Sequence, residues 1–262
     1  MKLGVNIDHI AVLREARRVN NPNLIDALSI CERAGAEQIT IHLREDRRHI
    51  QNKDVKDIIE HSTLPINLEC AIEPSIIDIV CSLKPHRATL VPEKREEVTT
   101  EGGLAVSLDN SRLIEAIKRL QESEIEVSLF IDPTVEATKI SSKLGVEWVE
   151  FHTGKFANIW AMLYSNLAKS NHSIKELELD RATLKSMLKS ELDTLKEVAI
   201  LAKELGLMVA AGHGLNYQNV KEIAKIKEIL ELNIGQSIVA RSIFTGLERA
   251  IIDMKELIEW KE

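Results

Sequence analysis

The sequence predicts one (β/α)8 TIM barrel domain with additional helices, an α/β fold, over residues 1–262. Short apolar runs of strand length alternate along the chain with amphipathic stretches of helical spacing. This alternation predicts a parallel sheet, because a parallel crossover needs about a dozen residues and usually contains a helix. About eight such units occur, which is the number that a closed barrel needs. Polar residues follow nearly every run, which favours a barrel with its site at one mouth.

The strand-sized runs are rich in Val, Ile and Leu and are bounded by polar residues. They are Leu3–Ile7, Gln38–Leu43, Ile66–Cys70, Arg87–Val91, Glu126–Ile131, Trp148–Thr153, Leu207–Ala211 and Ile229–Ile234. An open doubly wound sheet is the alternative arrangement of such units. The turn after the first run, Asn6-Ile7-Asp8-His9, lacks the Gly-rich phosphate fingerprint of that fold.

Amphipathic patterns between these runs predict the helices, and glycines mark several of their ends. Clear patterns are Asn23–Ala34, Val55–His61, Ser111–Glu122 and Val135–Leu144. Gly35 and Gly206 each follow a helical pattern and precede an apolar run, as expected of a helix stop.

Two segments depart from a minimal barrel. Residues 156–204 are long and mostly helical in pattern, so they predict an insertion with two or three helices where one would suffice. Its charged stretch 175–181 is interpreted as a solvated helix face, with a subunit contact as the alternative. Residues 92–103 (PEKREEVTTEGG) are polar and end in two glycines, which predicts a lid-like loop over the site.

Composition excludes several classes of protein. The 34 basic and 41 acidic residues give a formal net charge of -7, so we expect no nucleic-acid partner but leave room for a local anion pocket. No apolar run approaches a membrane span, and Asp8 and His9 interrupt any signal peptide, so we expect no membrane partner. Cys31, Cys70 and Cys81 lack CxxC spacing. We therefore expect buried thiols and a cytoplasmic location.

Strand alternation groups the titratable residues. Residues two apart on a strand share a face, as His42 and Arg44, Asn67 and Glu69, and Glu150 and His152 do. Because a barrel interior is normally apolar, charged groups inside it must meet a ligand or each other. A single His or Glu there is most simply a paired core group. Several at the ends of different strands favour a site.

Two regions favour anions. The segment after the second run, HLREDRRH, carries Arg44, Arg47 and Arg48, and arginine matches phosphate oxygens bidentately. Glycines surround His213 after the seventh run, and Gly235 follows the eighth run and leads into a helix. Loops in these positions often bind phosphate through backbone N–H groups. The sequence therefore predicts a doubly phosphorylated substrate or two phosphorylated substrates.

The set His42, Glu69, Glu150, His152 and His213 suits proton transfer. The same set suits metal ligation, which makes a metal-dependent TIM-barrel isomerase or hydrolase acting on a phosphorylated sugar the alternative function. No HxH or HExxH spacing occurs, and the nearby arginines oppose a cation, so we expect no metal. A non-catalytic phosphosugar sensor is the third possibility.

Longer motifs identify a resemblance. NIDHIAVLREAR, ITIHLREDRRHI, INLE, LVPEKREEVTTEGG, VSLFID, EFHTG, AGHGLNYQNV and ELNIGQSIVAR resemble, in order, the pyridoxine 5′-phosphate synthase family of vitamin B6 synthesis. The resemblance implies a (β/α)8 barrel that assembles as a homo-octamer built of dimers. It also implies condensation of 1-deoxy-D-xylulose 5-phosphate with 3-amino-2-oxopropyl phosphate to pyridoxine 5′-phosphate, phosphate and water. No metal or organic cofactor is implied.

The resemblance also implies residue roles. His42 and Glu69 match proton acceptors, His213 a proton donor and Glu150 a transition-state stabiliser. Contacts to deoxyxylulose phosphate fall on Asp8, His9, Arg44, His49 and Thr99. Contacts to the aminoketone phosphate fall on Asn6, Arg17, Gly214, Gly235 and Gln236, and the residue matching Arg17 reaches a neighbouring subunit's site. Gln236 departs from the family's histidine, so backbone binding of phosphate is expected to persist without an imidazole contribution.

Overall fold

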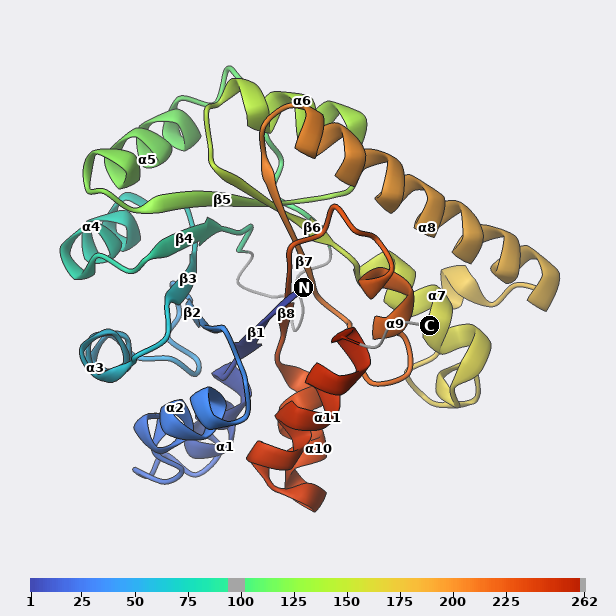
Figure 1. Cartoon of the computed structure of the whole chain (residues 1–262), viewed down its shortest axis with the longest axis horizontal. Coiled ribbons are helices and arrows are strands. Elements are labelled where there is room, and N and C mark those ends of the chain that lie inside the picture. Colours follow the sequence, from blue (N-terminus) through green and yellow to red (C-terminus); the bar gives the residue numbers. More distant parts are fainter. Residues whose placement is uncertain (94–101, 260–262) are drawn as a thin grey trace.

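A closed barrel of eight parallel strands forms the centre of the protein. The computed structural model describes residues 1–93 and 102–259, and the strands pair in sequence order, with β8 closing onto β1 (Figure 1). The strands are β1 Lys2–Asn6, β2 Gln38–Leu43, β3 Ile66–Cys70, β4 Arg87–Leu90, β5 Glu126–Ile131, β6 Trp148–His152, β7 Met208–Gly212 and β8 Glu231–Ile234. The predicted fold class is confirmed; three strands have the predicted bounds, and the ends of the others differ by at most two residues.

Helices surround the barrel and follow the strands in alternation (Figure 1). They are α1 Asp8–Glu15, α2 Leu24–Arg33, α3 Asn52–His61, α4 Pro74–Leu83, α5 Ser111–Glu122, α6 Val135–Lys143, α7 Gly154–Tyr164, α8 Arg181–Glu204, α9 Val220–Ala224, α10 Gln236–Thr245 and α11 Leu247–Glu259. Gly35 and Gly206 adopt φ values of +88° and +83° after α2 and α8, the left-handed geometry expected where a helix ends.

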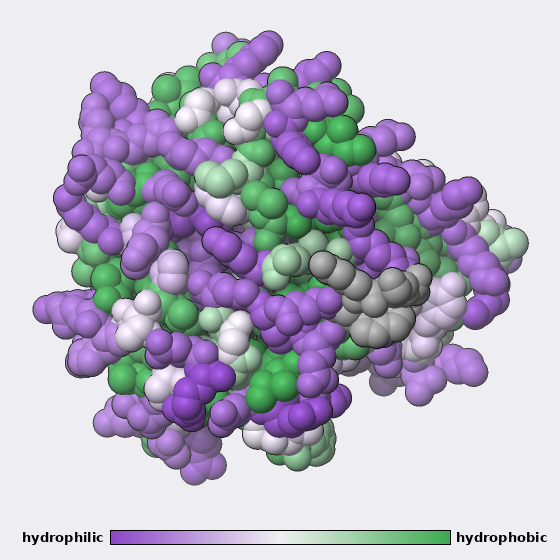
Figure 2. All heavy atoms as spheres, viewed as in Figure 1, coloured by the Kyte–Doolittle hydropathy of each residue, from purple (hydrophilic) through white to green (hydrophobic). Residues whose placement is uncertain are grey.

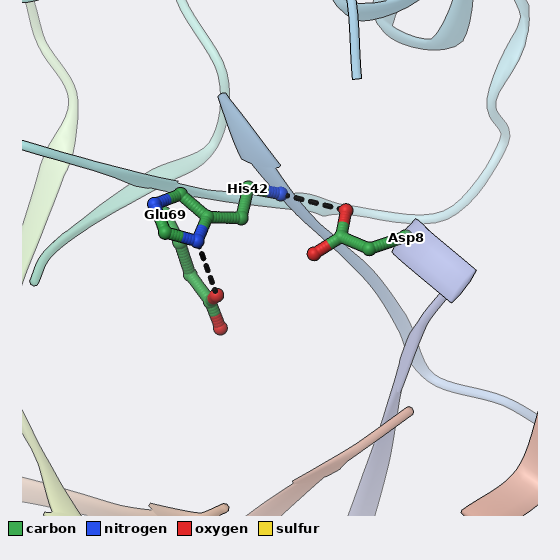
Figure 3. A group of neighbouring side chains, drawn as sticks. All are labelled: Asp8, His42 and Glu69. Atoms are coloured by element: carbon green, nitrogen blue, oxygen red, sulfur yellow. Dashed lines mark hydrogen bonds and ion pairs between the residues drawn. The ribbon is translucent and has the colours of Figure 1, made fainter. Parts of the chain in front are cut away.

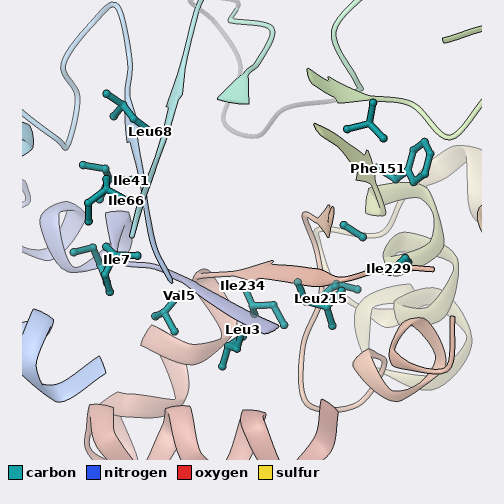
Figure 4. Close-up of a cluster of buried hydrophobic side chains, with 14 of the residues drawn as sticks. Leu3, Val5, Ile7, Ile41, Ile66, Leu68, Phe151, Leu215, Ile229 and Ile234 are labelled. Carbon is teal, nitrogen blue, oxygen red and sulfur yellow. The ribbon is translucent and has the colours of Figure 1, made fainter. Parts of the chain in front are cut away.

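The apolar core lies between the strands and the helices. Alternate strand residues such as Leu3, Val5 and Ile234 are buried and lie on the helix-facing side of the sheet (Figure 4). Burying a side chain of this size stabilises the fold by roughly 1.5–3 kcal/mol. This layer also takes up Cys31 and Cys70, and burial raises the pKa of the Cys31 thiol to about 12.

The barrel interior is polar, which contradicts the expectation of an apolar interior. Its buried side chains are Gln38, Thr40, Asn67, Arg87, Thr89, Ser128, Glu150, Glu231 and Asn233. Most of them are paired with one another, as Arg87 is with Glu231 at 2.8 Å. Buried polar groups are stable where they are mutually hydrogen-bonded. The helix-facing layer therefore supplies the apolar core.

The insertion lies between β6 and β7. It contains α7, two short 3₁₀ turns at Leu167–Lys169 and Lys175–Leu177, and the long helix α8 (Figure 1). The expectation that residues 175–181 form a helix face is wrong. Only Lys175–Leu177 form a 3₁₀ turn and residues 178–180 are irregular. The helix α8 begins at Arg181, after the N-cap Asp180, whose side chain accepts hydrogen bonds from the backbone of Ala182 and Thr183. An Asp at the N-cap position adopts a non-helical backbone conformation, and its side chain binds the first free N–H groups of the helix, so the helix does not extend further toward the N-terminus.

Polar and charged side chains cover most of the face that Figure 2 shows, with apolar groups between them. Exposed apolar side chains include Ile243 and Phe244 near the end of α10. Among the helices of residues 1–93 and 102–259, none combines the length and apolarity that crossing a bilayer requires. Of the predicted lid-like loop 92–103, residues 94–101 lie outside the described residues, and the loop stays a prediction.

Candidate active site

The polar residues that follow the strands meet at one mouth of the barrel. In a closed parallel barrel all carboxyl ends of strands lie on the same side. Asn6 ends β1, His42 lies near the end of β2 and Glu69 near the end of β3. Glu150 lies on β6, His213 follows β7 and Gly235 follows β8. These residues are far apart in the chain, and barrel closure brings them together.

Asp8, His42 and Glu69 form the centre of this mouth (Figure 3). Asp8 Oδ1 accepts a hydrogen bond from the backbone N–H of His42 at 2.9 Å. His42 Nδ1 lies 3.9 Å from Glu69 Oε2. One ligand atom from each of the three residues lies within 4.8 Å of the others. Asn6 orients Asp8, because Asn6 Nδ2 donates to Asp8 Oδ2 at 3.0 Å and Asn6 Oδ1 accepts from the Asp8 N–H.

Glu93 belongs to this cluster, and the sequence analysis missed it as a site residue. Its Oε1 lies 2.8 Å from His42 Nε2, and its Oε2 accepts the backbone N–H of Glu45. Burial opposes ionisation of Glu93, but the hydrogen bond and charge of His42, the backbone N–H of Glu45 and the charge of Arg44 together outweigh it, and the pKa of Glu93 is lowered. An ionised Glu93 accepts a hydrogen bond from Nε2–H of His42, which leaves Nδ1 as the ring nitrogen that can take up a proton. The polarity of the segment after β4 was the only available signal.

Two carboxyls, the half-buried Glu69 and the buried Glu150, have raised proton affinity. Burial, together with the charges of Glu150 and Asp8, raises the pKa of Glu69 well above its ordinary value. Burial and Glu231 raise the pKa of Glu150 to about 7, against the hydrogen bond from Asn233 and the charge of Arg87. Carboxyls tuned toward neutral pH can both take up and release protons there.

A second group of rings lies after β6 and β7. The His152 and His213 ring centroids are 4.8 Å apart in an edge-to-face arrangement. His152 Nδ1 is 3.1 Å from Asp132 Oδ1, which also accepts the backbone N–H of Gly103. Burial lowers the pKa of His213 to about 4, so this imidazole is neutral at neutral pH. Asp132, directly after β5, was not predicted as a site residue.

The loop after β7 contains two residues with positive φ, and the loop after β8 leads into a helix start. His213 adopts a φ of +78°, a conformation rare for a residue with a side chain, and Thr153 Oγ1 donates to its carbonyl at 2.7 Å. Gly235 is the N-cap of α10 and Gln236 is its first residue. The free N–H groups of this helix start point away from the helix and favour an anion.

The basic segment after β2 is more neutralised than the sequence analysis expected. Arg48 and Arg44 both contact Asp46, at 2.6 Å and 3.4 Å. Arg14 forms a bidentate pair with Asp54, with both distances 2.7 Å. The argument that crowded arginines require an anion is therefore weaker here. Arg44, half-buried and held only at the longer distance, is the cation best placed to serve a ligand.

The remaining predicted residues have varied positions. His49 is half-buried, with its ring centroid 6.2 Å from that of His42. His9 is exposed on the first turn of α1, and Arg17 is exposed in the turn after that helix. Gly214 follows His213 with a φ of +81°. Thr99 lies outside the described residues.

The arrangement suits acid–base chemistry on an anionic substrate. It combines a base at His42, two carboxyls with raised pKa, and a neutral imidazole at His213 around one opening. Helix-start N–H groups and Arg44 border it. Groups of different proton affinity around one pocket can move several protons in sequence.

Comparison with solved structures supports the fold. Phosphoribosylanthranilate isomerase from Thermotoga maritima aligns with a TM-score of 0.57 at 10% identity, covering 99% of this chain and 98% of that chain. The tryptophan synthase α-subunit from Pyrococcus furiosus aligns with a TM-score of 0.55 at 13% identity, covering 98% and 96%. At such low identity these similarities concern the fold alone.

Comparison of sequences identifies the family. Pyridoxine 5′-phosphate synthase of Sulfurovum sp. (strain NBC37-1) is 70% identical over 98% of this chain and 100% of its own length. The enzyme of the same name from Aliarcobacter butzleri (strain RM4018) is 66% identical over 99% of each chain. The sequence model of the family described as pyridoxal phosphate biosynthesis protein PdxJ matches residues 3–260. The chain therefore belongs to the PdxJ family of pyridoxal phosphate biosynthesis proteins.

Proposed function

We propose that this chain is a pyridoxine 5′-phosphate synthase. It condenses 1-deoxy-D-xylulose 5-phosphate with 3-amino-2-oxopropyl phosphate and releases pyridoxine 5′-phosphate, phosphate and water. The observation that carries the proposal is the convergence of Asp8, His42 and Glu69 at one mouth, with ligand atoms within 4.8 Å of one another, in a chain of this family. The names of its relatives supply the activity.

The residues act by general acid–base catalysis. The reaction proceeds through Schiff base formation, enolisation, phosphate loss, water addition and ring closure, and each step moves a proton. His42 accepts a proton at Nδ1, the nitrogen that faces Glu69 rather than Glu93. Glu69 is the second proton acceptor, and His213 donates a proton. Glu150 stabilises positive charge that develops in the transition state.

Two phosphorylated substrates bind at the mouth, each through its own set of residues. Arg44, His49, Asp8, His9 and Thr99 bind the deoxyxylulose phosphate. The aminoketone phosphate lies against Gly214 and the helix start at Gly235-Gln236, with Asn6 nearby and Arg17 contributed by a neighbouring subunit. The proposed enzyme is a cytoplasmic homo-octamer of dimers without metal or organic cofactor.

The test mixes the purified protein with both substrates and follows pyridoxine 5′-phosphate by its absorbance. Product that forms at the same rate with and without a chelator supports the proposal. Activity that the chelator abolishes supports the metal-dependent alternative, and substrate binding without product supports a sensor.

Glu69→Gln then tests the assigned role. We expect kcat to fall by about 10²–10⁴, the usual contribution of a positioned base. Glu136→Gln, an exposed carboxylate on the first turn of α6, is the matched control and should retain full activity. Normal turnover by Glu69→Gln contradicts the assignment.

A further inference from the structure

A continuous chain of buried polar side chains runs through the barrel interior to Glu150. Arg87 Nη1 donates to Glu231 Oε1 at 2.8 Å, and Gln38 Nε2 donates to the same oxygen at 2.8 Å. Gln38 Nε2 also lies 3.3 Å from Asn233 Oδ1, and Asn233 Nδ2 donates to Glu150 Oε2 at 2.7 Å. The chain thus links a cation on β4 to a carboxyl on β6.

The contacts fix which way the Asn233 amide points. Its Oδ1 accepts hydrogen bonds from two donors, Thr40 Oγ1 at 3.1 Å and Gln38 Nε2 at 3.3 Å. A flipped amide would place its NH₂ group against Gln38 Nε2, which can only donate and is itself fixed by Glu231, and its oxygen against Glu150. Only the observed orientation satisfies every partner, so Nδ2 is held as a donor toward Glu150.

Glycines on β1 and β7, the two strands that flank β8, make room for this series of hydrogen-bonded side chains. A Cβ on Gly4 of β1 would lie 2.1 Å from Asn233 Oδ1. A Cβ on Gly212 of β7 would lie 2.3 Å from Glu150 Oε1. Asn233 and Glu150 are therefore packed against backbone on the sides where these glycines lie, which restricts the movement of both side chains.

We propose that Asn233, oriented by Thr40 and Gln38, is a positioning residue that holds Glu150 and sets its charge state during the reaction. The inference rests on the proposed function for the role of Glu150 in catalysis. The positioning itself is a property of the free protein. A carboxylate that stabilises a developing cation must be ionised and aimed before the transition state forms, and a fixed N–H donor favours the ionised form.

The charged groups that face Glu150 come from three strands. Glu231 on β8 raises its pKa, whereas Arg87 on β4 and the Asn233 hydrogen bond lower it. The charge of Glu150 in turn raises the pKa of Glu69 on β3. Because burial already raises the Glu150 pKa to about 7, loss of the Asn233 donor moves its titration across neutral pH.

Asn233→Asp is the principal test. The replacement keeps size and an oxygen for Thr40 and Gln38, but it places a second carboxyl against Glu150. We expect the ionisation midpoint of Glu150 to rise by about one pH unit or more, as for carboxyls that share a site. The limb of the kcat pH profile that reports Glu150 moves to higher pH in parallel. The KM values of both substrates stay within about twofold, as expected when ground-state contacts are retained.

Infrared titration of the free enzyme measures the midpoint without turnover. The band of the protonated Glu150 carboxyl is identified as the difference between each protein and its Glu150→Gln version. Protein labelled with ¹³C in its glutamates separates this band from the new carboxyl at position 233. An unchanged midpoint in folded Asn233→Asp overturns the inference. If Glu150→Gln retains full kcat, the catalytic role fails while a shifted midpoint still supports positioning.

Thr40→Val tests the same chain if Asn233→Asp does not fold. It removes one of the two donors that orient the amide and keeps the side-chain volume. We expect kcat to fall about three- to tenfold with unchanged KM, the pattern of an interaction needed only in the transition state. Thr138→Val is the matched control, because this buried threonine on α6 also loses one hydrogen bond, to the Thr134 carbonyl. Equal kcat values in the two valine variants overturn the inference.

Discussion

At the scale of single residues, the site depends on which side chains the backbone leaves room for. Gly212 ends β7 beside Glu150 and Asn233, where a Cβ would lie 2.3 Å from Glu150 Oε1 and 3.0 Å from the Asn233 carbonyl oxygen. Neither the backbone nor a carboxyl held at 2.7 Å by Asn233 can move freely. Any side chain at position 212 must displace Glu150.

Gly212→Ala is therefore expected to lower kcat. A misplacement of about 1 Å at a catalytic group costs up to about 10²-fold in rate. Gly206→Ala is the matched control: Gly206 has a φ of +83° and nothing within 4 Å of its Cβ position, so it should lose about 1 kcal/mol of stability with unchanged kcat. Steady-state kinetics and thermal unfolding separate the two. Equal kcat losses would contradict the steric argument.

The raised pKa of Glu150 predicts how stability depends on pH. Its pKa is about 7 in the folded protein and 4.5 in the unfolded chain. Between these values the folded state binds more protons, so the free energy of unfolding falls as pH rises from about 4.5 to 7 and then levels off. The full difference corresponds to about 3 kcal/mol. A permanently neutral Gln at this position avoids that loss.

We therefore expect Glu150→Gln to stabilise the protein above about pH 7.5, by up to about 3 kcal/mol, while having little effect near pH 4.5. Denaturant unfolding at both pH values measures the difference. Glu136→Gln, at an exposed position, provides the baseline. A stabilisation of the same size at both pH values would show that ionisation of Glu150 is not its cause.

At the scale of elements, the proposed function assigns one phosphate to the start of α10. Gly235 is the N-cap and Gln236 the first helical residue, exposed to solvent. The backbone N–H groups of this first turn are available whatever side chain follows Gly235. The replacement of the family's histidine by Gln236 is therefore expected to remove an ionisable contact and to keep the main anion contacts.

Gln236→His is expected to leave the KM for 3-amino-2-oxopropyl phosphate within about threefold near pH 8 and to lower it below about pH 6.5, where an imidazolium forms. Gln236→Ala should change this KM by less than about threefold at all pH values, since the helix N–H groups remain. Measurement of the KM for 3-amino-2-oxopropyl phosphate as a function of pH in both variants tests these expectations. A large increase for Gln236→Ala would assign the anion contact to the side chain instead.

At the scale of the whole molecule, the proposed assembly makes one subunit complete the site of another. Arg17 is exposed in the turn after α1, and Ile243 and Phe244 expose apolar surface near the end of α10. In a two-fold dimer each interface is reciprocal, so a residue that reaches the partner's site does so in both directions. Complementation between defective subunits tests this directly.

Arg17→Ala and His213→Asn are each expected to be nearly inactive. Mixed, dissociated and reassociated, they should recover up to about a quarter of wild-type activity, because random two-fold pairing leaves half of the dimers mixed, each with one intact site. Light scattering reports whether the assembled mass is about eight subunits. No recovery from subunits that exchange would place Arg17 in its own subunit's site. As the control, each variant is dissociated and reassociated on its own and should recover no activity.

The sequence alone determined the barrel, because hydrophobic periodicity and helix stops depend on local pattern. The runs at Gln38–Leu43, Ile66–Cys70 and Glu126–Ile131 coincide with β2, β3 and β5. Polar residues at strand ends gathered at one mouth, since parallel closure brings all carboxyl ends together. The motifs also indicated the family, which the match over residues 3–260 confirms.

Only the tertiary structure decided what surrounds each of these residues. The contact of Glu93 with His42, that of Asp132 with His152, and the polar chain from Arg87 to Glu150 join strands or loops that are distant in sequence. The polar interior was not expected from the sequence, because the polar side chains pair with one another only once the eight strands close into a barrel. Alternation assigns a residue to a face of its strand, but the partner across the barrel depends on register and strand tilt, which no local pattern encodes.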